Sequence, residues 1–259
     1  MNFTLQAFLI TLGLLLGILL FLEIGRRIGV YRLNRDEEGL AKGGGAAEGA
    51  IFALLGLLIA FTFSGAASRF EERRHLITEE TNNIGTAYLR IDLLPNDAQT
   101  EMRELFKHYL DSRIAIFNSA ENKPILFEKI KESEQLQQKI WSTAIRDVKR
   151  TDAIPSAAML FLPALNAMID ITTTRLTATR NHPPIIIFGL LISLSFISAL
   201  LVGYSVSENE DRDWLHPLVF ASIMTLTIYV IIDLEYPRLG LIRISDADQV
   251  LIDLRNSMK

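Results

Sequence analysis

Charged residues that could do chemistry gather first at positions 69–74, directly after an apolar stretch. Arg69 and Arg73 are four residues apart and Glu72 is three from Arg69, so these side chains lie within reach on a helix. On a solvated helix such ion pairs contribute little to stability. The same cluster also suits an interhelical or intersubunit network below a membrane, where it would place positive charge at a pore entrance. The residues alone leave both interpretations open.

A second polar set lies within an apolar stretch near the C-terminal end. Four residues spaced by three and four positions share one face of a helix: Ser222, Thr225, Tyr229 and Asp233. A polar stripe in a membrane helix normally faces other helices rather than lipid. Asp233 stands at the end of the stretch beside Glu235 and Arg238, so we expect a structural salt bridge at the headgroup level.

A third set also has helical spacing: Glu101, Glu104, His108 and Asp111. Metal ligands can be spaced in this way, but a solvated acidic face is much commoner, so we predict no metal site. The sequence has no Cys, no phosphate-binding glycine loop and no serine nucleophile elbow. No catalytic residues and no cofactor are therefore predicted, and an enzyme is disfavoured. The net charge of -4 argues against a nucleic-acid binder.

The elements that must position these residues are membrane helices. Hydrophobic residues make up 49% of the chain and charged residues 22%, which is typical of apolar spans joined to a polar helical part. Four stretches are apolar over the roughly 20 residues that cross a bilayer: 4–22, 49–67, 184–206 and 214–234. The first stretch has no basic start and no clear cleavage site, so we interpret it as a retained membrane helix. Apolar spans indicate the inner membrane of a bacterium, since outer-membrane proteins use barrels.

Residues 69–183, between the second and third spans, have helical periodicity and no alternating strand pattern. Prolines at 95, 155, 183 and 184 end the predicted helices. We therefore predict an all-α membrane protein in four segments. Residues 1–68 hold spans one and two with their connecting loop, 69–183 a cytosolic helical domain, 184–236 spans three and four, and 237–259 a C-terminal tail. Apolar residues in the tail give it a face to bury against the helical domain.

The second span runs without a proline into the charged cluster, so one helix would continue from the membrane into water. Small residues follow one side of the span at helical spacing: Gly49, Ala53, Gly56, Ala60, Ser64 and Ala67. Small residues let membrane helices approach closely, while the bulky Leu57 and Phe61 could line an axis. The sequence therefore allows two interpretations of this helix. It forms a wall of a pore, or it joins a membrane assembly to a soluble one.

Charge fixes neither the orientation nor the sign of a permeating ion. Lys and Arg flank the two sides of the four spans almost equally. The basic residues of the 69–74 cluster would favour anions, whereas the acidic residues of 207–213 would favour cations at the opposite entrance.

The stretch from Phe61 to Arg74 resembles the bestrophin superfamily. Its Phe is followed eight residues later by the pattern Arg-aromatic-x-Glu-x-Arg, formed here by Arg69, Phe70, Glu72 and Arg74. Two further stretches, EETNNIGTAYLRIDLLP and YVIIDLEYPRLGLIRIS, are similar to bacterial membrane proteins with a bestrophin-like domain. The resemblance covers about residues 48–245.

The resemblance implies a homopentamer with a central pore lined by the second span, and with both termini and the 69–183 domain in the cytosol. The partners would be other copies of the chain, the lipid bilayer and the permeating ions. The implied neck consists of Ala53, Leu57 and Phe61, of which Ala53 is smaller than usual, and the inner mouth consists of Ser64, Ser68 and Arg69. Only two acids, Asp246 and Asp248, stand where animal relatives clasp calcium, so calcium gating is not expected.

Two functions remain open. One is an oligomeric ion channel of undecided anion or cation selectivity. The other is a non-conducting membrane scaffold or stress sensor that binds a partner through its helical domain, because tight packing explains the small residues equally well.

Overall fold

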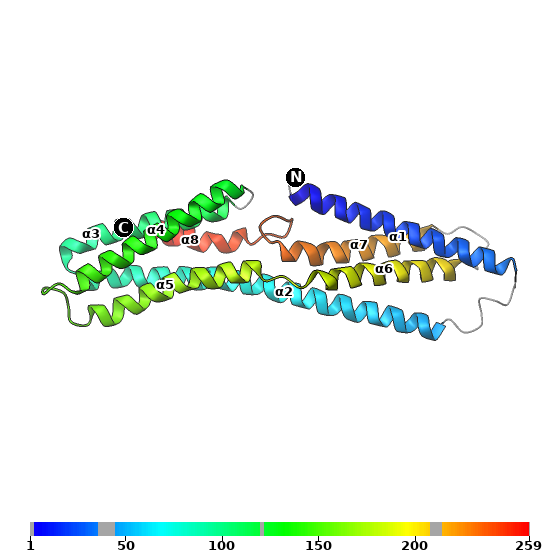
Figure 1. The fold of residues 1–259 in the computed structure, drawn as a ribbon, viewed down its shortest axis with the longest axis horizontal. Helices are drawn as coiled ribbons and strands as arrows, with labels where there is room; N and C mark the ends of the chain where they lie inside the picture. Colours follow the sequence, from blue (N-terminus) through cyan, green and yellow to red (C-terminus); the bar gives the residue numbers. More distant parts are fainter. Residues whose placement is uncertain (1–2, 36–44, 120–121, 208–213, 259) are drawn as a thin grey trace. The chain divides into compact units, whose positions relative to one another are not determined.

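The chain folds into helices wherever the structure describes it. The computed structural model describes residues 3–35, 45–119, 122–207 and 214–258. These ranges hold eight α-helices, one short 3-10 helix and no strand (Figure 1). The predicted all-α class is therefore confirmed. The acidic residues 208–213 lie outside the described ranges.

Four helices are long and apolar enough to cross a membrane, which confirms the predicted number of spans. They are α1 (Phe3–Leu33), α2 (Gly45–Leu89), α6 (Ile185–Val206) and α7 (Leu215–Glu235). Helix α1 continues beyond the predicted end at residue 22, because no proline interrupts it and Glu23 pairs with Arg26 and Arg27. Helix α2 is 45 residues long, so the apolar stretch and the charged cluster belong to a single helix.

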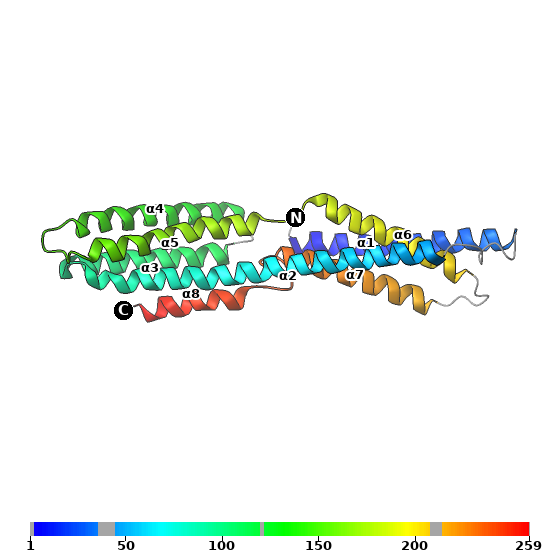
Figure 2. The ribbon, with the colours of Figure 1, turned by 90° about the horizontal axis from the view of Figure 1, so that it is seen from below.

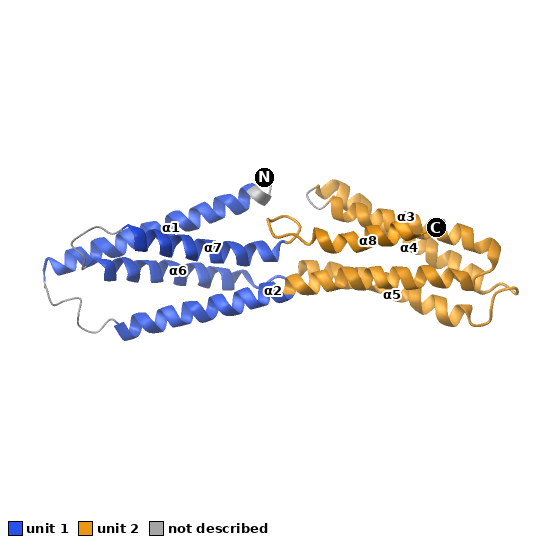
Figure 3. Cartoon of the chain, turned by 180° about the vertical axis from the view of Figure 1, so that it is seen from behind, with its two compact units in different colours: residues 1–68, 182–236 blue, residues 69–181, 237–259 orange. Residues whose placement is uncertain are grey.

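The chain divides into two compact units (Figure 3). Unit 1 comprises Met1–Ser68 and His182–Tyr236, and it holds α1, the apolar part of α2, α6 and α7. Unit 2 comprises Arg69–Asn181 and Pro237–Lys259, so the C-terminal tail belongs with the helical region.

Within unit 1, helices α1 and α6 touch backbone to backbone through two glycines. A Cβ atom added to Gly25 would overlap the carbonyl oxygen of Leu200, and one added to Gly203 would overlap the carbonyl oxygen of Leu22. Only glycine fits at such a crossing. The close packing that we expected along the second span is therefore found, within this chain, between the first and third spans.

Unit 2 contains the remainder of α2, η1 (Arg90–Leu93), α3 (Asn96–Asn118), α4 (Lys123–Val148), α5 (Ala157–Arg180) and α8 (Ser245–Ser257). Figure 2 shows α3, α4, α5 and α8 running alongside one another. Their apolar faces form one core, whose buried members include Phe106, Tyr109, Ile140, Phe161 and Leu251. Asn122 caps α4 by accepting a hydrogen bond from the backbone N–H of Ile125, and Pro124 lies in the first turn.

Candidate functional site

The apolar part of α2 has a buried face and an exposed face. Leu55 and Ala66 are only 3% and 0% exposed, and they are eleven residues apart, which is close to three full helical turns. Leu57 and Phe61, in contrast, are 52% and 68% exposed. The other expected pore residues, Ala53, Ser64 and Ser68, are exposed on the same side. The structure thus brings five of the six expected pore residues onto one face that is turned away from the rest of the unit.

Arg69 does not share this face. It follows Ser68 directly and therefore lies about 100° further round the helix, where it is half-buried. The expected inner mouth of Ser64, Ser68 and Arg69 is thus divided between two sides of α2. The exposed face continues instead through Glu72 and His75.

Five of the six small residues of α2 also lie on exposed surface. A Cβ atom added to Gly49 or Gly56 would meet nothing within 4 Å. Ala53, Ala60 and Ser64 are likewise exposed, whereas Ala67 is half-buried. Most of the small-residue stripe is therefore left uncovered by the described parts of its own chain.

Two arginines of the charged cluster have partners that we did not predict. Arg74 donates hydrogen bonds to Glu71, at 2.9 and 3.1 Å. Arg73 is only 6% exposed, and its guanidinium donates to the backbone carbonyls of Ala178 and Asn181 at the C-terminal end of α5. Positive charge is favourable at a helix C-terminus, so Arg73 acts as a cap. Phe70, the aromatic residue of the Arg-aromatic-x-Glu-x-Arg pattern, packs against the core of unit 2.

A buried charge network in unit 2 was not predicted. Glu80 of α2 is 0% exposed; it accepts from the Nε of Arg113 at 2.6 Å and from Arg175. Burial lowers the pKa of the Arg113 guanidinium. Burial, followed by repulsion from Arg238, lowers the pKa of Arg175 to about 9, so the Arg175 guanidinium stays protonated at pH 7. The network ties α2 to α3 and α5.

The network extends to the segment after the last span. The guanidinium carbons of Arg175 and Arg238 each lie 4.5 Å from the ring centre of Phe117, a cation–π distance. Arg238 also donates two hydrogen bonds to Asp248, at 2.8 and 2.9 Å. Arg238 therefore connects α8 to the network.

The polar stripe of α7 is split by burial. Ser222 is exposed, whereas Thr225 is buried, and its hydroxyl finds no hydrogen-bond partner among the described residues. The hydroxyl of Tyr229 lies 3.2 Å from a carboxylate oxygen of Asp233, which is 1% exposed. The stripe is thus largely an internal feature of unit 1, as polar residues in membrane helices usually are.

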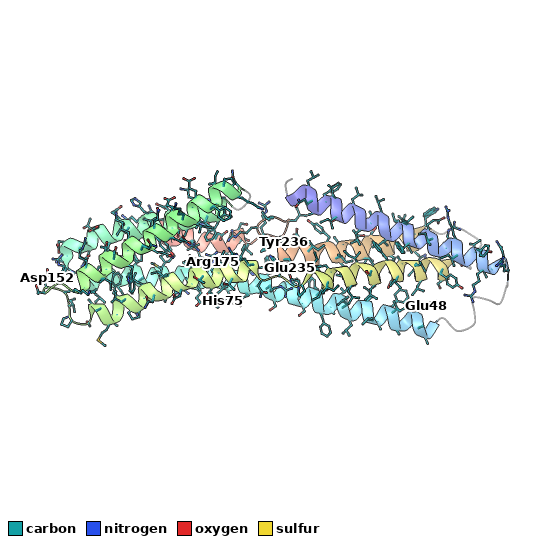
Figure 4. The ribbon with its side chains drawn as sticks, viewed as in Figure 1. Glu48, His75, Asp152, Arg175, Glu235 and Tyr236 are labelled. Carbon is teal, nitrogen blue, oxygen red and sulfur yellow. The ribbon has the colours of Figure 1, made fainter. Side chains whose placement is uncertain are left out.

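A histidine adjoins the end of α7. His182 Nδ1 lies 3.2 Å from Glu235, a buried carboxylate, and its ring stacks on Tyr236 at 4.8 Å. Glu235 and Tyr236 are labelled in Figure 4. Sequence spacing gave no hint of this pair, because its members are 53 positions apart.

The acids of α3 are engaged in ion pairs. Glu101 pairs with Arg146 and Glu104 with Lys107, while Asp111 pairs with Arg255 of α8. The hydrogen bond from Lys107 lowers the pKa of Glu104. No group of three potential metal ligands occurs within the described parts of the chain. Glu101 and Asp111 of the acidic face therefore link α3 to α4 and α8.

Comparison with known proteins identifies one family. Residues 47–249, most of the chain, match the Bestrophin-like domain. No curated protein and no solved structure matches the sequence. The match begins in the first turn of α2 and ends within α8, and it includes both the exposed face and the buried network. The chain belongs to the Bestrophin-like family.

Proposed function

We propose that this membrane protein is an ion channel built from several copies of the chain, with the exposed face of α2 lining the pathway. The family suggests a channel-type membrane protein rather than an enzyme. In keeping with the resemblance, we propose a homopentamer in a bacterial inner membrane, with both termini and unit 2 in the cytosol.

The observation that carries the proposal is the chemical character of the exposed face of α2. Its apolar window is the least buried of the four, at 11% against 28% for the windows of α6 and α7. Ser64 and Ser68 are exposed there beside Leu57 and Phe61. Hydroxyl groups are poor partners for lipid tails, so this face suits contact with water or with protein.

The two sides of that face have different residue sizes, which fits an assembly around an axis. Gly49 and Gly56 offer open backbone to a neighbouring copy. Leu57 and Phe61 project between a quarter and somewhat over a third of a turn away from them. A ring of large apolar side chains would form a constriction that can gate by dewetting.

The proposal is tested by recording currents from purified full-length protein in planar bilayers, with its mass in detergent measured in parallel. We expect an oligomer that conducts, and a larger current from Phe61→Ala because the constriction widens. Phe8→Ala is the matched control. Phe8 is also exposed, at 61%, but it lies on α1, which is not part of the proposed pathway, so its loss should leave the current unchanged. A monomer, or silence from both wild type and Phe61→Ala, would contradict the channel and favour a scaffold.

A further inference from the structure

The exposed face of α2 continues past the apolar span and becomes acidic. Residues seven positions apart lie within about 20° of one another on a helix. One such series is exposed along the whole helix: Leu54, Phe61, Ser68, His75, Asn82 and Leu89. Glu72 and Glu79 are exposed beside it, and His75 is 73% exposed (Figure 4). His75 Nδ1 lies 4.0 Å from a carboxylate oxygen of Glu79, so the two side chains share this surface.

The basic residues of the same region are held away from this face. Arg73 is buried, with its guanidinium on the end of α5. Arg74 lies about 100° round the helix from His75 and is paired with Glu71, and Arg69 is half-buried. Between Ser68 and Asn82, the exposed series and its flanks therefore carry carboxylates and no Lys or Arg.

We propose that Glu72 and Glu79 make the pathway prefer cations over anions. This rests on the proposed channel with α2 facing its axis. In a symmetric assembly each glutamate is repeated once per copy, which gives two rings of carboxylates about 10 Å apart along the helix. Acidic rings attract cations and exclude anions in ion pathways. Clefts lined by one sign of charge enrich counter-ions locally.

This proposal differs from the effect that composition suggested for the 69–74 cluster. The arginines of 69–74 would favour anions if they faced the pathway, but the fold uses Arg73 as a helix cap and Arg74 in an ion pair. The carboxylates that remain on the exposed face have the opposite effect.

The test is the reversal potential of purified full-length protein in a KCl gradient, at about pH 8 so that imidazole groups are largely neutral. Wild type should reverse toward the potassium equilibrium potential. In the double variant Glu72→Gln with Glu79→Gln, we expect the potassium-to-chloride permeability ratio to fall by roughly tenfold, the lower end of the enrichment that such charges produce. Both side chains are exposed, so the variant should fold and assemble like wild type.

A matched control removes the same number of acids elsewhere. Glu128 and Glu134 are exposed on α4, and replacing both by Gln should leave the permeability ratio unchanged. If wild type conducted but preferred chloride, or if the double variant kept the wild-type permeability ratio, the role of Glu72 and Glu79 would be overturned. The proposed channel would not be contradicted by either result. If neither wild type nor Phe61→Ala conducted a current, the proposed channel would be contradicted, and this inference would be contradicted with it.

Discussion

Glu80 is the residue on which the position of α2 in unit 2 most depends. Its carboxylate is fully buried, and its two oxygens accept from Arg113 and Arg175. Without this carboxylate, the two buried guanidinium groups would have no acid to offset their charge. The fold would then be much less stable, because both groups are already removed from water. The sequence holds a local signal for this site. Glu80 lies between Ile77 and Ile84 on the apolar face of the helix, where a charge needs a partner.

We expect Glu80→Gln to destabilise unit 2 by about 3–5 kcal/mol, since the amide keeps the shape but leaves both arginines uncompensated. Thermal unfolding of the full-length protein in detergent, followed by circular dichroism, measures this change. Glu104→Gln is the control, because Glu104 pairs with Lys107 at an exposed site and its loss should leave stability nearly unchanged. Equal effects of the two variants would show that the buried network does not hold α2.

At the scale of elements, glycines determine which helices come close together. The α1–α6 crossing relies on Gly25 and Gly203, whose positions lack room for even one methyl group. In the apolar part of α2, by contrast, Gly49 and Gly56 face open space. A sequence shows small residues at helical spacing in both places but does not show which of them meet a partner within the chain.

We therefore expect Gly25→Ala and Gly203→Ala each to destabilise unit 1 by about 1–3 kcal/mol, because the added methyl group must push two backbones apart. Gly189→Ala on α6 is the control, since an added Cβ there meets nothing within 4 Å. Resistance of the purified protein to unfolding by added SDS measures the difference. If Gly189→Ala were as harmful as Gly25→Ala, direct backbone contact would not explain the crossing.

At the scale of the whole molecule, features set by local chemistry were predictable and features set by tertiary contact were not. Proline and apolar length are local properties, so the spans and the helix ends near Pro95, Pro155 and Pro183 follow from them. Arg73 shows the limit. Its sequence neighbours suggested pairing along α2, yet its partners lie more than 100 residues away on α5. The contact between His182 and Glu235 could not be predicted either, because the two residues are far apart in the sequence.

The most direct test of the proposed pathway uses cysteine accessibility, which is clean here because the chain has no Cys of its own. Currents are recorded from Ser64→Cys, Ser68→Cys and Phe63→Cys while a charged methanethiosulfonate reagent is added. All three positions are exposed in the single chain, but only the first two lie on the proposed pathway. The account predicts that the reagent blocks the currents of Ser64→Cys and Ser68→Cys and spares that of Phe63→Cys. Currents of the two serine variants that persist after complete modification would contradict it.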